Sequence, residues 1–489
     1  MEYSPRSEPM GAVDRAWLGM DSETNLMIIN GVMLFDEVID YDRFLQIWEE
    51  RLLSQYARFR QRPIEKPRGS GRYMWEEDPY FDIRAHVRRI ALPAPGDART
   101  LQGLIGDLMS TDLDRHKALW RVYLIENVAG GCAIFSRFHH CIADGIALIR
   151  VMLSMTDEEA DMDFMALEVE NEMIASGEGF SLLGPIKPMV RFAKSAFGGA
   201  SKATSTLFHE TMQAIEDPGA AFEAAKSMGV ITAASVAVLT RLIVIPPDRD
   251  SVFKGELGVV KRVVWSDPVD LVEVKRIGKA FGGTVNDVLI AALTGALRSY
   301  MLYRDDRPDD GDIRSMVPVN LRPLEGDIEL GNRFGLVYLT LPVSLGDPLE
   351  RLYEVRRRMN ILKSSPEAIL VYQVLNLLGM LPGDLAEKAT NVFASKASAV
   401  LTNVPGPQQT LYFAGKPVRR IMFWVPQSGD IGLGLSIISY NREVMLGIVI
   451  DEKLASDPEI IMESFTEEFA TLGRLADARQ NIMEETAPL

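Results

Sequence analysis

The sequence His139-His140-Cys141-Ile142-Ala143-Asp144-Gly145 places two of the chain's five histidines side by side. It directly follows residues 132–138, a run of β-forming residues that predicts a strand. Residues 127–131, which include two glycines, predict a hairpin between that strand and another at 120–125. A strand that ends in two histidines, followed by an acid and a glycine, is an unusual arrangement. The pattern indicates chemistry at a strand end, in a fold built around a sheet.

Paired histidines suggest either metal binding or base catalysis. Adjacent residues on a strand point to opposite faces, so His139 and His140 cannot easily hold one ion, and no second cluster with ligand spacing accompanies them. We therefore expect no metal. An imidazole titrates near neutrality, which suits a group that takes up a proton and returns it. Asp144 would orient the turn, and Gly145 would permit a backbone conformation closed to other residues. The alternative is that both are ordinary core histidines.

Motifs for other kinds of catalysis are missing from the sequence. It contains no Gly-x-Ser-x-Gly elbow, no Cys-x-x-Cys and no phosphate-binding loop. Gly432-Leu433-Gly434 lacks the third glycine of a dinucleotide fingerprint, and Cys141 is an incidental candidate nucleophile. What remains is a reaction without a covalent enzyme intermediate or a redox cofactor.

The composition is that of a globular protein of two or three domains, with 489 residues, 47% hydrophobic and 25% charged. The net charge of −16 makes nucleic acid an unexpected partner. With two cysteines there is no disulfide framework, so a reducing compartment and a cytoplasmic location are expected. The apolar stretches at 230–245 and 368–380 fall short of the roughly 20 residues that a spanning helix needs. We expect a protein that is soluble or lies on a membrane without crossing it.

Strands and helices interleave in both halves, which predicts an α/β or α+β fold with mixed sheets. Between them the pattern changes: residues 157–178 are acidic, 180–208 are basic and 230–245 are apolar. We therefore divide the chain into an N-terminal subdomain (1–156), a helical connector (157–250) and a C-terminal subdomain (251–489). Further strands are predicted at 25–35, 261–265, 315–320, 334–343, 397–403, 433–440 and 444–450, and helices at 41–53, 271–280, 284–302, 347–362 and from 457.

The stretch 139–145 matches the HHxxxDG motif of the coenzyme A-dependent acyltransferase superfamily, and further segments resemble one family within it, the wax ester synthase/diacylglycerol acyltransferases. Leu119-Trp120 is similar to that family's Pro-Leu-Trp segment, although Ala118 stands where proline is usual. Asn286-Asp287 is similar to its Asn-Asp motif. Other matching segments are Phe81-Asp82, His86-Val87, Ala91-Leu92-Pro93, Leu113-Asp114, Val317-Pro318-Val319-Asn320-Leu321-Arg322, Thr402-Asn403-Val404-Pro405-Gly406-Pro407 and Ser439-Tyr440. They follow the family's order over nearly the whole chain.

The resemblance implies two chloramphenicol-acetyltransferase-like subdomains, each a mixed sheet flanked by helices, with a tunnel between them. It implies that His140 is the general base. It also implies a long-chain acyl-CoA as co-substrate, with no bound cofactor, and a fatty alcohol or diacylglycerol as acceptor. The expected products are wax esters or triacylglycerol. Two other readings stay open: an acyltransferase of the same superfamily with a small or carrier-bound acceptor, and a non-catalytic lipid-binding protein.

Roles for the remaining site residues follow from their surroundings. Asn286 lies near a predicted helix N-terminus and would assist the oxyanion, or it would only cap the helix together with Asp287. We expect structural roles for His139 and for Asp144, the latter as a buried orienting acid. The basic segment after 180 would dock on an anionic lipid surface or lipid inclusion; the alternative is a solvated helical connector.

Overall fold

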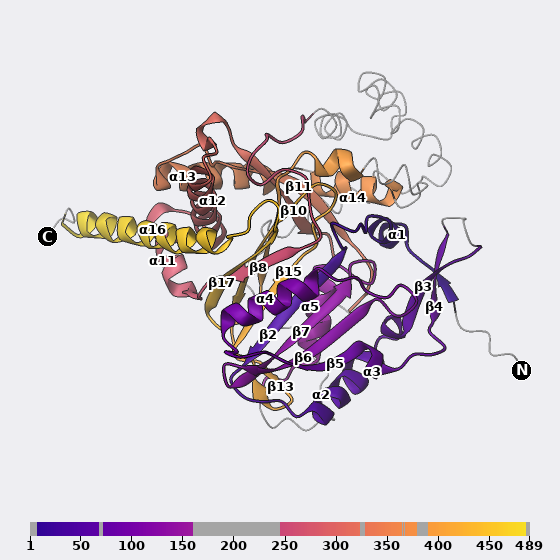
Figure 1. The fold of residues 1–489 in the computed structure, drawn as a ribbon. Coiled ribbons are helices and arrows are strands. Elements are labelled where there is room, and N and C mark those ends of the chain that lie inside the picture. Colours follow the sequence, from indigo (N-terminus) through magenta and orange to yellow (C-terminus); the bar gives the residue numbers. More distant parts are fainter. Residues whose placement is uncertain are drawn as a thin grey trace, which may run out of the picture.

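The computed structural model describes residues 7–67, 72–159, 245–322, 328–363, 365, 367–378 and 390–485. Of the acidic, basic and apolar stretches predicted for the connector, only residues 157–159 and 245 are among these residues, so the connector stays a prediction. In Figure 1 the first half of the chain (indigo to magenta) lies below the second half (pink to yellow). Each half contains a large sheet with helices packed against it.

The first sheet is formed mainly by the N-terminal half. In sheet order its strands are β15 (Arg420–Trp424), β2 (Ile28–Phe35), β7 (Gly131–His139), β6 (Trp120–Val128) and β5 (Val87–Ala91). The expected hairpin is confirmed, because β6 and β7 pair antiparallel through a turn with positive φ at Asn127, Ala129 and Gly130. Every residue of β7 is buried. This strand therefore carries the paired histidines into the interior.

The second sheet belongs to the C-terminal half. In sheet order its strands are β11 (Phe334–Leu341), β10 (Ile313–Asn320), β12 (Ala399–Pro405), β16 (Leu433–Tyr440), β17 (Glu443–Asp451) and β8 (Lys261–Trp265), with β9 (Val269–Asp270) also on β17. The neighbours β10, β12 and β16 are parallel, whereas the other pairs are antiparallel. The expected mixed sheets are confirmed, and β8 and β16 begin and end where the sequence predicts.

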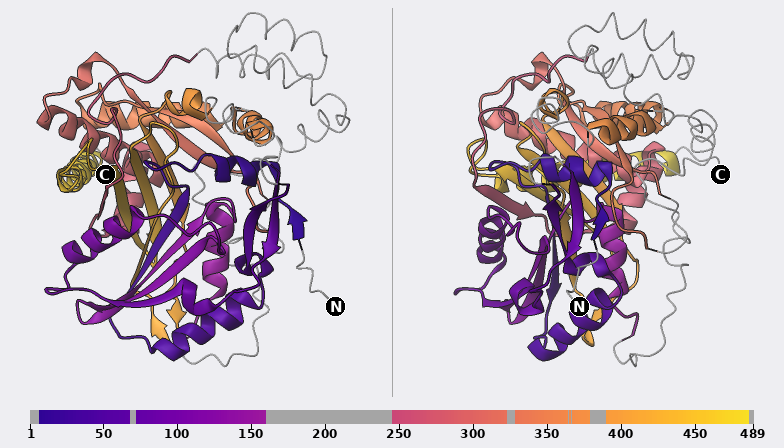
Figure 2. Two further views of the ribbon diagram at one scale, coloured as in Figure 1. Left: turned by 45° about the vertical axis from the view of Figure 1, so that its right-hand side comes forward. Right: turned by 90° about the vertical axis from the view of Figure 1, so that its right-hand side faces the viewer.

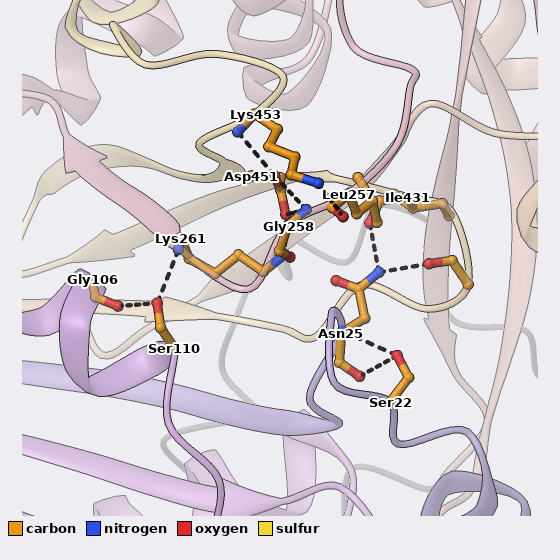
Figure 3. Close-up of polar contacts among 11 residues, drawn as sticks. Ser22, Asn25, Gly106, Ser110, Leu257, Gly258, Lys261, Ile431, Asp451 and Lys453 are labelled. Atoms are coloured by element: carbon orange, nitrogen blue, oxygen red, sulfur yellow. Dashed lines mark hydrogen bonds and ion pairs between the residues drawn. The ribbon is translucent and has the colours of Figure 1, made fainter.

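The two halves interlock at two places. Strand β15, which comes from the predicted C-terminal subdomain, pairs antiparallel with β2 in the first sheet. Helix α4 (Ala98–Met109) packs on β8 so closely that a Cβ on Gly106 would lie 2.7 Å from the Lys261 carbonyl oxygen. Figure 3 shows Ser110 at this contact, where its hydroxyl accepts from the Lys261 amide at 2.9 Å and donates to the Gly106 carbonyl at 2.8 Å. The halves thus form one packed unit.

Helices cover both sheets (Figures 1 and 2). The second sheet carries α11 (Leu271–Phe281), α12 (Val285–Tyr303), α13 (Pro348–Lys363) and α16 (Glu459–Glu485), and α12 contacts the other three. In the first half lie α1 (Ala12–Gly19), α2 (Tyr41–Ile47, continued by a π-helical turn at Trp48–Leu53), α3 (Ile83–His86) and α5 (Gly145–Ser154). Helix α14 (Glu367–Leu378) packs on β11 and on α1, and so joins the halves.

Shorter elements complete the fold. A three-stranded sheet contains β1 (Ser7–Pro9), β4 (Tyr73–Glu77) and β3 (Gln61–Glu65), and a ribbon contains β13 (Tyr412–Phe413) and β14 (Lys416–Pro417). Short 3₁₀ turns lie at Ala57–Arg60 and Pro308–Asp310. Across the described ranges, no single helix has both the length and the apolar character to span a bilayer; α11 and α12 pass only as a pair bent by 94°.

Hydrophobic side chains from both halves share one core between the two sheets. It contains Phe135 of β7, Phe423 of β15 and Val449 of β17, together with Ile105 of α4. All four are buried. Burial of such side chains contributes roughly 1.5–3 kcal/mol each, so the junction is held by packing as well as by hydrogen bonds. The elements that meet there position the paired histidines against the C-terminal half.

Candidate active site

The His140 side chain is enclosed by aromatic rings from two elements. Its backbone amide extends the pairing of β7 with β2 by donating to the Met27 carbonyl at 2.7 Å. The imidazole stacks on Trp17 of α1, with ring centroids 4.1 Å apart, and Phe334 at the start of β11 lies 5.4 Å away. The residue is only 5% exposed. His140 therefore sits where α1, β7 and β11 meet.

The two ring nitrogens of His140 have different surroundings. Nδ1 forms a hydrogen bond of 2.7 Å with Oδ1 of Asn332. In the part of the chain that the structure describes, Nε2 has no hydrogen-bond partner. Burial lowers the pKa of His140 from 6.5 to about 4, although the charge of Asp144 and the bond to Asn332 oppose the shift. The ring is thus neutral at pH 7, with one nitrogen left to take up a proton.

This pKa predicts an unusual acid limb of the rate profile. If His140 is the general base that the resemblance implies, only its neutral imidazole accepts a proton, so kcat/KM for acyl transfer is expected to hold as pH falls below 6.5 and to drop only near the His140 pKa of about 4. The unfolded chain would protonate this histidine near 6.5, so acid also destabilises the fold between these values. Rates should be measured after brief acid exposure, with far-UV circular dichroism as the control for unfolding. An acid limb centred between 6 and 7 would contradict the assignment.

His139 faces different partners from His140. Its Nδ1 accepts a hydrogen bond from the Cys141 amide at 3.1 Å, so the neutral ring carries its proton on Nε2. That nitrogen lies 3.5 Å from Oδ2 of Asp21, which also binds Arg115 at 2.8 Å. Both histidines are buried, but their ring nitrogens have different partners. These contacts favour the structural role expected for His139.

Asp144 makes hydrogen bonds and a buried ion pair with residues around the turn, the kind of contact through which it was expected to orient that turn. Its Oδ1 caps α5 by accepting from the Ala147 amide at 2.9 Å. Its Oδ2 accepts from Arg322 Nε at 3.0 Å and from the Arg333 amide at 2.9 Å. Both carboxylate oxygens are therefore occupied within the protein, and neither binds the His140 ring. The carboxylate therefore contacts the start of α5 and the residues around Arg333 rather than the ring.

The conformational reason expected for Gly145 is wrong. This glycine begins α5 with φ outside the left-handed region, and a Cβ added to it would meet nothing within 4 Å. The backbone therefore does not require glycine there. The open space beside it is what distinguishes the position.

Asn286 lies at the start of α12, where the predicted capping box is confirmed. Thr284 accepts from the Asp287 amide at 3.3 Å, and the Asp287 carboxylate accepts from the Thr284 amide at 2.7 Å. Capping is thus done by these two residues. The Asn286 side chain instead accepts from Asn403 Nδ2 at 2.6 Å through its Oδ1. This arrangement leaves its NH₂ group without a partner among the described residues.

The pairing of the strands places Asn286 and His140 at the same end of the central strands of the second sheet. Strands β10 and β12 are parallel, so both end there, and β11 begins there because Phe334 pairs with Asn320. Asn403 lies near the end of β12 and Phe334 lies beside His140. Two strand spacings separate β12 from β11, about 10 Å. Asn286 and His140 therefore lie at the same end of these strands, although their side chains do not touch.

An apolar cavity lies against Trp17, the ring that stacks on His140. It is lined mainly by Trp17, Met316, Leu336, Val371, Val374 and Phe393. These residues come from α1, β10, β11, α14 and the segment before β12, so both halves contribute. Trp17 thus contacts the His140 ring and also forms a wall of the cavity. The cavity occupies the junction where a tunnel was expected; a continuous tunnel stays a prediction.

Among the residues that the structure describes, neither a metal cluster nor a reactive thiol accompanies the histidines. Within the ranges that the structure describes, no group of three or more His, Cys, Asp or Glu residues could hold an ion. Cys141 is fully buried, and burial raises the pKa of its thiol well above the ordinary value. That thiol stays protonated at neutral pH, which makes it a poor nucleophile.

Sequence reasoning missed Asn332, Asp14, Trp17 and the roles of Arg322 and Arg333. Asn332 lies 192 positions from His140, so no local motif joins them. The segment 317–322 was recognised only as part of a strand resembling the family. A polar residue next to a glycine just before a predicted strand, as in Gly331-Asn332, was the one available signal.

The profile of the wax ester synthase/diacylglycerol acyltransferase catalytic domain matches residues 10–289, and that of the WS/DGAT C-terminal domain matches residues 330–473. The chain belongs to this family. The resemblance seen in the sequence is thereby confirmed, and with it the expectation of an acyltransferase. The two matched segments do not overlap, and the catalytic segment comes first.

Curated relatives cover most of this chain. A probable diacylglycerol O-acyltransferase of Mycobacterium tuberculosis is 28% identical over 446 residues, or 90% of each chain. O-acyltransferase WSD of Acinetobacter baylyi is 26% identical over 462 residues, covering 90% of this chain and 92% of the other. Both are named as acyltransferases, in agreement with the family.

Solved structures share the fold. The wax ester synthase/diacylglycerol acyltransferase from Marinobacter aquaeolei VT8 superposes with a TM-score of 0.65 at 21% identity, covering 96% of this chain and 100% of the other. The first condensation domain of the calcium-dependent antibiotic synthetase gives a TM-score of 0.55 at 14% identity, with 97% of both chains covered. The architecture expected from the sequence is therefore confirmed.

Proposed function

We propose that this acyltransferase moves a long-chain acyl group from coenzyme A to the hydroxyl of diacylglycerol or a fatty alcohol, with His140 as general base. The observation that carries the proposal is the neutral, buried imidazole whose Nδ1 is held by Asn332 and whose ring stacks on Trp17, a wall of the apolar cavity. The family assignment supports the reaction type. The names of the relatives support both kinds of acceptor.

The reaction needs no covalent enzyme intermediate. Nε2 of His140 takes the hydroxyl proton while the alcohol oxygen attacks the thioester carbonyl carbon and the new C–O bond forms. The C–S bond of the tetrahedral intermediate then breaks, and the departing thiolate takes the proton back from the imidazolium. Base catalysis is worth about 10²- to 10⁴-fold, so positioning and oxyanion stabilisation supply the rest.

Asn286 is the proposed donor to the oxyanion. Asn403 holds its amide oxygen, so the NH₂ group is the end available to a substrate. The N-terminus of α12 lies beside it and adds a favourable field for negative charge. Because both proposed acceptors are insoluble in water, we also propose that the protein works in the cytoplasm at a membrane or lipid-inclusion surface.

An acceptor panel tests the function. Purified protein is given palmitoyl-CoA with dioleoylglycerol, hexadecanol or a short polar alcohol, and ester formation is followed by thin-layer chromatography. Transfer to the long-chain acceptors is expected. Activity confined to small polar acceptors would support the rival substrate class, and binding of lipid without ester formation would support a non-catalytic protein.

The cavity predicts a change in chain-length preference. Val371 lies on its wall, so Val371→Phe fills space that a long acyl chain would occupy. We expect the rate with long-chain substrates to fall by about tenfold or more while short chains are spared, since a single methylene shifts selectivity by roughly 10- to 200-fold. Val272→Phe, at a 53% exposed position on α11, is the matched control. Equal losses for long and short chains would show that this cavity does not hold the chain.

A further inference from the structure

The His140 ring is held by a side chain from the other half of the molecule. We propose that Asn332 is a positioning residue that fixes His140 as its Nδ1–H tautomer, and that Asp144 serves the site by placing Asn332. This inference rests on the proposed function, in which Nε2 must carry the lone pair. It assigns a role to a residue that lies outside the histidine motif.

Hydrogen-bond polarity fixes the tautomer. Asn332 Nδ2 donates to the His140 carbonyl at 2.7 Å and to Asp14 Oδ1 at 2.9 Å. A carbonyl only accepts, so the nitrogen of the amide must face it and the amide oxygen must face the ring. That oxygen lies 2.7 Å from His140 Nδ1 and also only accepts. Nδ1 is therefore the donor, and in the neutral ring the lone pair lies on Nε2.

The residues on both sides of Asn332 are tied to the histidine turn. The Gly331 amide donates to the Ile142 carbonyl at 3.0 Å, and the Gly331 carbonyl accepts from the Asp144 amide at 3.2 Å. On the other side, the Arg333 amide donates to Asp144 Oδ2 at 2.9 Å. Gly331 has φ of +91°, a conformation that favours glycine. Asn332 is thus held in place by the turn that carries its target.

An ion pair between Asp144 and Arg322 strengthens these contacts. Arg322, from the end of the preceding strand, donates through Nε to Asp144 Oδ2 at 3.0 Å and through Nη2 to the Gly331 carbonyl. The ion pair is buried, with side chains 8% and 4% exposed. One oxygen of Asp144 therefore caps α5 while the other holds the segment that carries Asn332.

Helix α1 anchors the amide from the opposite side. Asp14 Oδ1 accepts from both the backbone amide and Nδ2 of Asn332, at 3.1 and 2.9 Å. Trp17 lies one helical turn after Asp14, so the two share a face of α1. One short helix thus supplies both the anchor of the amide and the ring that stacks on His140. The imidazole can neither flip nor tilt without breaking contacts to both halves.

The first test reads the tautomer directly and needs no activity. Nitrogen-15 NMR of protein labelled in its five histidines distinguishes a protonated from an unprotonated ring nitrogen, and His140→Ala identifies the signals. At neutral pH we expect protonated Nδ1 and unprotonated Nε2 in the resting protein. Protonated Nε2 would overturn the inference even in an active enzyme. An inactive wild type with the expected tautomer would instead overturn the proposed function alone.

The second test uses Asn332→Ala with Asn25→Ala as the matched control. Asn25 is also buried and also bridges the halves, since it donates to the Gly429 and Ile431 carbonyls at 2.7 and 2.9 Å (Figure 3). Among the described residues, no hydrogen bond or ring contact joins Asn25 to His140. For Asn332→Ala we expect kcat to fall about 10- to 100-fold, as for other groups that orient a functional histidine, with little change in KM and a mixed tautomer signal. For Asn25→Ala we expect a comparable loss of thermal stability with kcat near wild type. Equal kcat in the two variants would overturn the role of Asn332.

Discussion

His140→Ala is expected to reduce ester formation by about 10²- to 10⁴-fold, the full contribution of a general base. The substitution removes Nε2, the one ring nitrogen without a partner among the described residues. It also leaves a cavity against Trp17 and an unpaired Asn332 oxygen. Large-to-small changes of buried residues cost about 2–5 kcal/mol, so stability must be measured beside the rate.

His86→Ala separates the chemical loss from the structural one. His86 is also buried, stacks on Trp120 with centroids 4.7 Å apart, and forms one hydrogen bond of 2.9 Å through Nδ1 to the Trp120 carbonyl. We expect this variant to lose similar stability in urea denaturation but to keep most of its turnover. If His140→Ala turned over nearly as fast as wild type, the assignment of the base would fail.

Of these substitutions, Asp144→Ala is expected to lower the free energy of unfolding most. The change removes the cap of α5, worth about 0.5–2 kcal/mol, and leaves buried Arg322 without its carboxylate, a loss of about 3–5 kcal/mol. The free energy of unfolding, measured in urea, should fall by at least about 3 kcal/mol. Activity falls with it, because the Gly331–Arg333 segment that carries Asn332 loses its anchor.

Two further variants separate the contribution of the ion pair from that of a helix cap. Asp144→Asn keeps a capping side chain but removes the charge that pairs with Arg322, so it isolates the ion pair. Asp270→Ala removes only an exposed cap, that of α11, and is expected to lose about 1 kcal/mol. If Asp144→Ala lost no more free energy of unfolding than Asp270→Ala, the contacts of Asp144 with Arg322 and Arg333 would contribute little to the stability of the fold.

Elements with a strong local pattern were predictable from the sequence. Strand β8 contains two valines and a tryptophan, and β16 is rich in leucine and isoleucine; both were placed at their observed bounds. The capping box before α12 fixed the start of that helix because the two side chains bond residues only three apart. Local hydrogen bonds and side-chain periodicity leave their mark in a few consecutive residues, which a single sequence displays.

Long-range pairing was not predictable in the same way. Strand β15 is an apolar run like many others, and nothing within it says that it pairs with β2, nearly 400 positions earlier. The Asn332–His140 contact is equally remote. The role of Gly145 was misjudged because a glycine after a turn suggests an unusual φ, whereas here it begins a helix. Such features depend on how the two halves dock, which no local pattern records.

In the proposed reaction the acyl group passes directly from coenzyme A to a lipid hydroxyl that His140 deprotonates. Rapid-quench analysis of a single turnover with radiolabelled palmitoyl-CoA tests it most directly. We expect coenzyme A to be released only when a long-chain acceptor is present, in step with the ester, and with no label bound to the protein. Label that attaches to the protein before acceptor is added, and then passes into the ester, would contradict it.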